Sequence, residues 1–169
     1  AIAATAPKRY FVWEIDKRSG GKRVVCHPAR ELKPLQHYFL HAVLDSLPIH
    51  SSATAYVRGS SIKRNALEHL ASRVILKLDF ADFFNSLKAS HWRAYASDHF
   101  PDWSPEEIEF SSRILFWGVR SYSPKCLAIG APTSPHLSNA LMFDVDEKLH
   151  AYAARSGLVS TRYADDITF

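Results

Sequence analysis

Two adjacent aspartates, Asp165 and Asp166, constrain the fold of this chain more than any other feature. They lie in the segment TRYADDITF, between a predicted strand at 158–163 and a second strand that begins at 167. Neighbouring residues of a regular strand point to opposite faces, whereas a turn at 164–166 lets both carboxylates face an adjacent strand. Because two like charges so close together repel each other, a bound divalent cation is the usual remedy. The segment therefore predicts a tight turn that carries a cation site.

A third acid, Asp79, ends the apolar run RVILKLDF, which predicts a mostly buried strand over residues 74–79. If this strand is the neighbour of the double-aspartate turn, three carboxylates meet at one edge of a sheet. Mg²⁺ prefers such oxygen ligands, and two ions about 3.5–4 Å apart can clamp the attacking and leaving oxygens of a phosphoryl transfer. The alternative is an exposed turn at Asp165-Asp166, with Asp79 capping the helix that follows it.

The remaining pattern alternates strands and helices and predicts a mixed α and β fold. A hairpin is expected from strands at 10–13 and 23–26, joined by a basic turn with Gly20-Gly21. Helices are predicted at 29–46, 61–71 with Ser61 as its cap, 88–99, 105–117, and in one long helix that follows Gly130 and is closed by Gly157. The phrase SPEE places Ser104 and Glu107 in a capping box at the start of the 105–117 helix.

Composition excludes some classes and leaves others open. The 169 residues are 47% hydrophobic and 22% charged, with a formal net charge of +4, which is compatible with nucleic acid without requiring it. Cys26 and Cys126 lack a metal-ligand spacing, and we expect reduced thiols in a cytoplasmic protein. No apolar run is long enough to span a membrane, so no membrane association is expected.

Three motifs, in this order and spacing, resemble those of reverse transcriptases. LDFADFF (78–84) is similar to the motif that carries the first catalytic acid, GAPTSPHLSN (130–139) to the motif that packs under the incoming nucleotide and template, and YADD (163–166) to the motif with the other two acids. NALEH (65–69) matches the Asn-Ala-x-x-His element of bacterial retron reverse transcriptases, and 22–36 resembles their basic fingers segment.

The resemblance implies an α+β right-hand polymerase with fingers and a partial ferredoxin-like palm, truncated before the thumb. Its expected divisions are fingers at 1–74, a palm strand with the first catalytic acid at 75–87, a helical fingers insertion at 88–129, and an incomplete palm at 130–169. The chain is accordingly expected to be a piece of a larger protein, weak or inactive as a polymerase by itself.

The resemblance also implies site residues. Asp79, Asp165 and Asp166 would be catalytic and would bind two Mg²⁺ ions, with Mn²⁺ as a substitute, assisted by the backbone carbonyl of Phe80. Nucleotide contacts are expected from Lys22, Arg23, Ala81, Asp82, Phe83, Phe84, Ile129 and Gly130. In this set, Phe84 is the expected steric gate against a ribose 2′-OH, and the alternative is core packing beside Phe83. For Lys22 and Arg23, the alternative is that they lie on a solvated hairpin edge.

Two further elements refine the expected specificity. Asn65 and His69 share a helix face and are read as RNA-binding, the alternative for His69 being a satisfied structural group. Asn139 is either an inward polar anchor or a surface residue. Many relatives carry glutamine at the position of Ile129, whereas diversity-generating enzymes carry an aliphatic residue there, as this chain does. We therefore hypothesise altered nucleotide selection. An unchanged misincorporation spectrum in Ile129→Gln would contradict this hypothesis.

The function implied is RNA-directed DNA polymerase activity of retron type, which adds dNTP units to an RNA-primed end. The implied partners are a structured noncoding RNA that is template and primer, an RNA–DNA hybrid product (msDNA), and an accessory effector protein in antiviral defence. The alternatives are an intron-encoded or diversity-generating reverse transcriptase, a catalytically silent RNA-binding scaffold, or, more distantly, a metal protein that is not a polymerase. The scaffold is disfavoured because three buried like charges would need another explanation.

Overall fold

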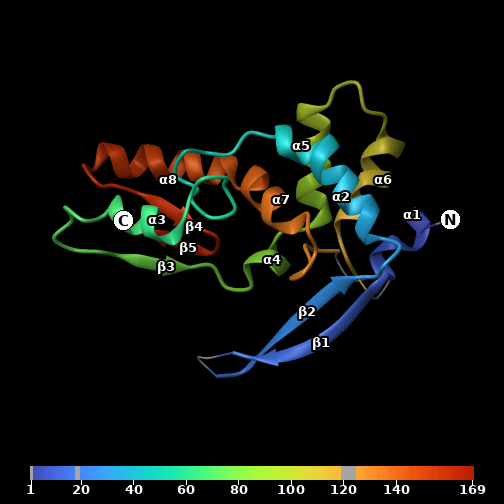
Figure 1. Ribbon diagram of the computed structural model, residues 1–169. Coiled ribbons are helices and arrows are strands. Elements are labelled where there is room, and N and C mark those ends of the chain that lie inside the picture. Colours follow the sequence, from blue (N-terminus) through green and yellow to red (C-terminus); the bar gives the residue numbers. More distant parts are fainter. Residues whose placement is uncertain (1, 18–19, 119–124) are drawn as a thin grey trace. The chain divides into compact units, whose positions relative to one another are not determined.

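The computed structural model describes residues 2–17, 20–118 and 125–169, and the chain divides into two compact units (Figure 1). Unit 1 comprises Ala1–Ser46 and Phe84–Ser134, and unit 2 comprises Leu47–Phe83 and Pro135–Phe169. Each unit is therefore built from two separate stretches of sequence. The assignment of segments to fingers and palm stays a prediction.

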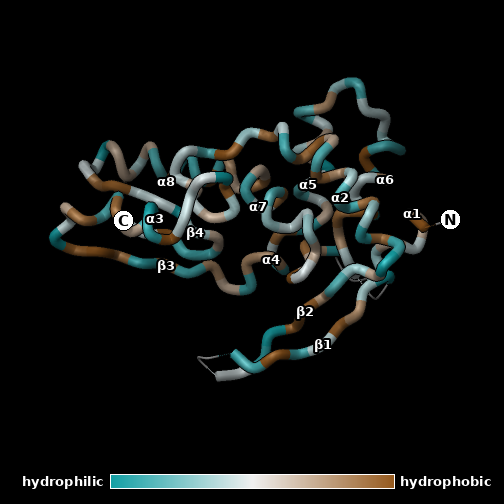
Figure 2. The backbone as a smooth tube through the Cα atoms, viewed as in Figure 1, coloured by the Kyte–Doolittle hydropathy of each residue, from teal (hydrophilic) through white to brown (hydrophobic). Residues whose placement is uncertain are grey.

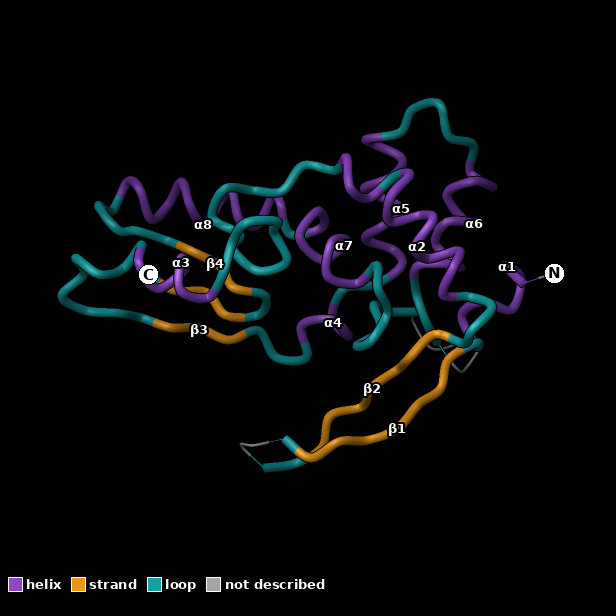
Figure 3. Tube along the Cα trace, viewed as in Figure 1, coloured by secondary structure: helices purple, strands orange, loops and turns teal. Residues whose placement is uncertain are grey.

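Unit 1 contains an antiparallel hairpin that extends from a helical body (Figure 3). Its strands are β1 (Tyr10–Asp16) and β2 (Lys22–Pro28), paired from Tyr10 opposite Pro28 to Asp16 opposite Lys22. At the base of the hairpin, Cys26 packs with Ala128 and Ala131. The predicted hairpin is confirmed, and its strands are longer than the apolar runs because the pairing continues through polar residues.

The helical body of unit 1 contains α1 (Ile2–Thr5), η1 (Ala6–Lys8), α2 (Lys33–Ala42), η2 (Leu44–Ser46), α5 (Ala89–His99) and α6 (Pro105–Leu115). Trp92 of α5 is fully buried and its indole N–H donates to Ser111 of α6 at 2.8 Å. The Ser104–Glu107 capping box is present as predicted. The helix predicted at 29–46 is shorter, because α2 ends at Ala42 and a 3₁₀ turn follows it.

Unit 2 is a three-stranded antiparallel sheet with helices packed around it. The strand order is β3 (Lys77–Asp79), β5 (Asp166–Thr168), β4 (Thr161–Tyr163), and the helices are α3 (Ile62–Leu67), α7 (Ser134–Leu141) and α8 (Phe143–Arg155). A short helix, α4 (Phe83–Ser86), begins at the boundary between the units. None of the helices within the described ranges is long and apolar enough to cross a membrane.

Two predictions about unit 2 are wrong. The helix expected after Gly130 is interrupted at Met142, whose backbone (φ −89°, ψ −4°) separates α7 from α8. The strand expected to be mostly buried over 74–79 is regular only at β3, and its apolar residues are exposed, from 82% at Val74 to 48% at Leu78. Figure 2 shows the apolar stretch that leads into β3. The apolar composition of 74–79 indicates burial, but composition does not show which other segment, if any, covers the strand.

Candidate active site

The hairpin formed by β4 and β5 carries the double aspartate. Tyr163 pairs with Asp166 across it, so Ala164 and Asp165 form a two-residue turn. Ala164 has φ +58°, a left-handed conformation that is uncommon for a residue with a Cβ, and it is buried. The turn predicted at 164–166 is thus confirmed, with Asp166 already in the strand.

Asp79 lies directly opposite Asp166 in the antiparallel register of β3 and β5. Just beyond this pair, the backbone amide of Phe80 donates a 3.0 Å hydrogen bond to the carbonyl oxygen of Asp165. The strand of Asp79 is therefore the neighbour of the turn, as the convergence of three acids required. One end of this small sheet brings Asp79, Asp165 and Asp166 together in backbone register.

The carboxylates are more exposed than the sequence suggested. Asp79 is exposed, and Asp165 and Asp166 are half-buried. Lys77, two residues before Asp79, places Nζ 2.9 Å from Oδ2 of Asp166. The hydrogen bond to Asp166 is the main cause that raises the pKa of Lys77. The idea of three buried like charges is therefore wrong: solvent and a neighbouring ammonium group reduce their repulsion.

The donor set fits a hard divalent cation in its chemistry, since all three groups are carboxylates. Within the described ranges, however, no three His, Cys, Asp or Glu side chains form a group that could hold a metal ion. The salt bridge from Lys77 instead supplies positive charge to Asp166. The three aspartates therefore suit a divalent cation in the type of their donor atoms and in their strand register. In the described residues their side chains do not form a group of three ligands.

A buried arginine, Arg162, holds the turn through a hydrogen bond to its backbone. Arg162 of β4 is 1% exposed, and its guanidinium binds Asp146 of α8 through Nε (2.7 Å) and Nη2 (2.6 Å). Nη2 also donates to Oδ1 of Asn139 at 3.1 Å, and Nη1 donates to the carbonyl oxygen of Ala164 at 2.9 Å. Asn139 in turn donates to Ala55, so it is the inward anchor that was one of its two interpretations. The network connects α7 and α8 to the turn.

Sequence reasoning missed Arg162, Asp146 and Lys77. The signal available was a charged residue inside an otherwise strand-like segment, because Arg162 directly precedes Tyr163 where burial is expected. A buried charge requires a partner, but the sequence does not say that this partner lies 16 positions earlier. Lys77 lies on the predicted strand, and the alternation of that strand alone assigns it no role.

The segment after Asp79 forms a turn and leads into α4. Asp82 has φ +49°, and the ring of Phe83, which is buried, stacks on Phe80 with centroids 5.9 Å apart. The guanidinium of Arg162 lies 5.9 Å from the centroid of the Phe83 ring. Since the Phe80 amide already bonds to Asp165, the amides that follow it are the ones left to be tested as phosphate donors.

The other predicted nucleotide contacts belong to unit 1. Lys22 forms a 2.8 Å ion pair with Glu14, and Arg23 is exposed on the same strand. The Ile129 carbonyl accepts from the Cys26 amide at 2.7 Å. Gly130 has φ +115°, and a Cβ there would lie 3.2 Å from the Cys26 carbonyl oxygen, so this backbone favours glycine. Phe84 also belongs to unit 1, and its role stays a prediction.

Asn65 and His69 of the Asn-Ala-x-x-His element face the protein interior. The Thr54 hydroxyl donates to Oδ1 of Asn65 at 2.7 Å, and Nε2 of His69 lies 2.7 Å from Oγ1 of Thr161. His69 is 4% exposed. The two side chains therefore attach the α3 segment to the loop before it and to β4, while RNA binding by them stays a prediction.

Residues 15–169 match the family described as reverse transcriptase (RNA-dependent DNA polymerase). The chain belongs to this family, which confirms the resemblance carried by its motifs.

Its relatives include retron reverse transcriptases. The chain is 38% identical to the retron Mx162 reverse transcriptase of Myxococcus xanthus over 179 residues, which cover 95% of this chain and 35% of that protein. It is 35% identical to the retron Mx65 enzyme of the same organism, covering 96% and 40%. Identity to the retron Ec83 reverse transcriptase of Escherichia coli is 33%, covering 95% and 52%. The chain thus spans about a third to a half of the length of these relatives.

Proposed function

We propose that the protein is an RNA-directed DNA polymerase of retron type. The observation that carries this proposal is the register of Asp79 opposite Asp166, beside a turn that holds Asp165, in a chain of the reverse transcriptase family. Its relatives of 33–38% identity are named as retron enzymes, which favours that type over intron-encoded or diversity-generating ones.

The proposed reaction joins a primer hydroxyl to the α-phosphorus of a dNTP, with breakage of the bond to the leaving pyrophosphate. Asp79, Asp165 and Asp166 would hold divalent cations, Mg²⁺ or Mn²⁺, together with the Phe80 carbonyl. Bound there, such cations supply positive charge that lowers the pKa of the attacking hydroxyl and stabilises the leaving oxygens.

The residues of the chain contribute binding and orientation to this proposal. We assign nucleotide contacts to the backbone of 81–83, the aromatic ring of Phe84, the segment Ile129-Gly130, and the basic pair Lys22-Arg23. Among these, Phe84 would exclude a ribose 2′-OH by its bulk. Arg162 does not contact the nucleotide in this scheme; it is a positioning residue that holds the Ala164 carbonyl and so the turn.

The proposed partners are nucleic acids. They are dNTP, a structured noncoding RNA that serves as template and primer, and the RNA–DNA hybrid that results. An accessory effector and a role in defence against phage complete the proposal, by analogy with retron systems.

The test is a primer-extension assay with the full-length protein, its co-expressed RNA, labelled dNTP and Mg²⁺. The Asp165→Asn/Asp166→Asn variant is compared with Asp98→Asn/Asp102→Asn, which removes the same charge from exposed positions outside the site. We expect the first variant to bind RNA and make no DNA, and the control to extend like the wild type. If the wild type binds RNA tightly but makes no DNA with Mg²⁺ or Mn²⁺, the silent scaffold replaces the polymerase as the better proposal.

A further inference from the structure

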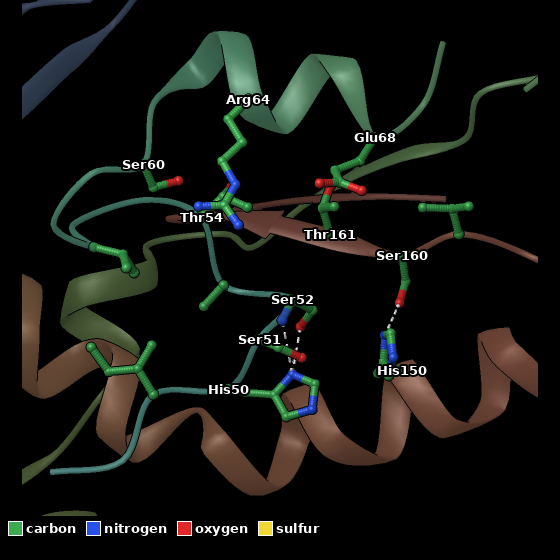
Figure 4. A pocket seen from close by; sticks show the side chains of 14 residues that line it. His50, Ser51, Ser52, Thr54, Ser60, Arg64, Glu68, His150, Ser160 and Thr161 are labelled. Carbon is green, nitrogen blue, oxygen red and sulfur yellow. Dashed lines mark hydrogen bonds between the residues drawn. The ribbon is translucent and has the colours of Figure 1, made fainter. Parts of the chain in front are cut away.

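Unit 2 contains a cavity of about 410 Å³ beneath α3 (Figure 4). Loop residues 49–54 form one wall, residues 159–161 form another, and His150 of α8 lies on the side opposite α3. All of its lining residues belong to unit 2 and none is one of the three aspartates. The cavity is thus a separate feature from the candidate active site.

The walls of the cavity carry several polar groups that are fixed by hydrogen bonds. Five lining residues are each less than a tenth exposed although they are polar: His50, Ser52, Thr54, Ser160 and Thr161. His50 bonds through Nδ1 to the Ser52 hydroxyl (2.8 Å) and through Nε2 to Glu147 (3.0 Å), and His150 bonds to the Ser160 hydroxyl (2.9 Å). Hydroxyl and imidazole groups held in this way suit a ligand with many oxygen atoms.

The wall formed by α3 carries a cation, Arg64, that has no acidic partner in the described part of the chain. The side chain of Arg64, on α3, extends toward Thr54 (Figure 4). Its guanidinium has no ion pair or hydrogen bond within the described ranges. Next to it, the Ser60 hydroxyl is buried and has no hydrogen-bond partner among the described residues. Glu68 also lines the cavity, beside Thr161, and would repel a phosphate at that end. The place suited to an anion is therefore the end at Arg64 and Ser60.

The segment that carries Arg64 is basic in sequence. The stretch 58–73 contains Arg58, Lys63, Arg64 and Arg73 against the single acid Glu68. All four cations are exposed, and the salt bridges of the described part of the chain include none of them. Exposed cations without acidic partners among the described residues complement the negative charge of a phosphodiester backbone.

We propose that the cavity beneath α3, together with the cations at 58–73, binds a phosphodiester unit of an RNA strand. Arg64 and the Ser60 hydroxyl contact a phosphate, while the hydroxyl-rich wall at Thr54 accommodates the ribose, whose 2′-OH distinguishes RNA from DNA. Asn65 and His69 are then positioning residues, since their bonds to Thr54 and Thr161 set the position of α3 over the cavity. This inference deepens the proposed function, on which it rests for the choice of RNA.

The first experiment measures binding of a labelled unstructured RNA oligonucleotide, and of the DNA of the same sequence, to the full-length protein by fluorescence anisotropy at several salt concentrations. Arg64→Ala is compared with Lys148→Ala, which removes an exposed cation of α8 that does not line the cavity. We expect Arg64→Ala to weaken RNA binding about tenfold and to reduce the slope of log K against log salt by about one, as for one lost phosphate contact. Lys148→Ala is expected to leave both the RNA affinity and the salt slope within a factor of two of the wild-type values.

Two further measurements separate the possible outcomes. Ser60→Ala should weaken the binding of RNA and DNA alike, because its hydroxyl contacts the phosphate, whereas Thr54→Val should reduce the preference for RNA over DNA. Extension of an exogenous primed template by the wild-type protein tests the polymerase proposal separately. If Arg64→Ala leaves the RNA affinity unaltered, the inference is overturned even when the wild-type protein extends primers. If Arg64→Ala loses RNA affinity and the wild-type protein never extends a primer, the inference is supported while the polymerase proposal fails. Arg64-dependent binding of AMP without such binding of the strand would assign the cavity to free nucleotides and also overturn it.

Discussion

Arg162 donates a 2.9 Å hydrogen bond from Nη1 to the carbonyl oxygen of Ala164, the first residue of the turn that presents Asp165 and Asp166. The same guanidinium is held in place by Asp146 and is almost completely buried. The position of the turn therefore depends on a buried ion pair whose acidic member is on a different element, α8.

Arg162→Met should destabilise the protein strongly, because Asp146 would remain buried without a cation. Loss of one partner of such a pair costs about 3–5 kcal/mol, and replacing both partners by apolar residues recovers much of that loss. We expect Arg162→Met/Asp146→Leu to regain most of the free energy of unfolding, measured by urea denaturation, with Arg155→Met as the exposed control.

The same double variant separates stability from positioning. Since it has no donor for the Ala164 carbonyl, its DNA synthesis should remain reduced even where it is folded, with its main effect on kcat. Full activity in the folded double variant would show that the Arg162–Ala164 bond is not required to position the turn.

Ala164→Val should be far more damaging than Ala164→Gly. Glycine adopts φ +58° freely, so the strain it relieves offsets the buried methyl it removes, and the free energy of unfolding should change by less than about 1 kcal/mol. A β-branched residue in the left-handed region should cost about 2 kcal/mol or more. Parallel urea denaturation of both variants measures the difference; equal losses would contradict an origin in backbone conformation.

The features that sequence predicted correctly are those decided by local chemistry. Ser61 caps α3 by accepting a hydrogen bond from the Arg64 amide, and Gly157, at φ +67°, follows the end of α8. The turn at Ala164 follows from residues on either side that favour strands and from an aspartate that tolerates turns. Each involves positions only a few residues apart, so the pattern contains the needed information.

The features that sequence did not predict depend on packing between distant segments. The side-chain partners of Arg162 come from two helices, and the exposure of Val74 depends on what covers the sheet rather than on its own composition. The grouping of 47–83 with 135–169 is likewise a result of tertiary contacts. For the candidate site, motif order identified the three acids, but only the register showed that Asp79 faces Asp166.

Cys26 should be unreactive toward alkylating agents in the native protein. Burial is the main cause that raises its pKa to about 12, and the nearby Cys126 thiol adds to the shift. At pH 8 only about one thiol in 10⁴ would then be ionised, against roughly a quarter for a free cysteine. Iodoacetamide labelling followed by peptide mass spectrometry should show modification of Cys26 only after denaturation; rapid native labelling would contradict this environment.

The capping box of α6 should make part of the stability dependent on pH. Hydrogen bonds from Ser104, the backbone one being the larger cause, lower the pKa of Glu107 from 4.5. A carboxyl whose pKa is lower in the folded state stabilises it at pH values above the unfolded pKa, and this contribution is lost as pH falls through the folded pKa. The window therefore lies below about pH 5.

Ser104→Ala should cost about 1 kcal/mol at pH 7, and the cost should shrink as the pH is lowered toward 3 and protonation of Glu107 weakens the box. Tryptophan fluorescence, to which Trp103 next to the cap contributes, can follow urea denaturation at both pH values. Glu107→Gln should remove the pH dependence of the difference, whereas Glu106→Gln, which deletes the same charge one position earlier and no bond of the cap, should retain it. A cost of Ser104→Ala that is equal at pH 7 and pH 3 would mean that the hydroxyl acts alone, without help from the Glu107 carboxylate.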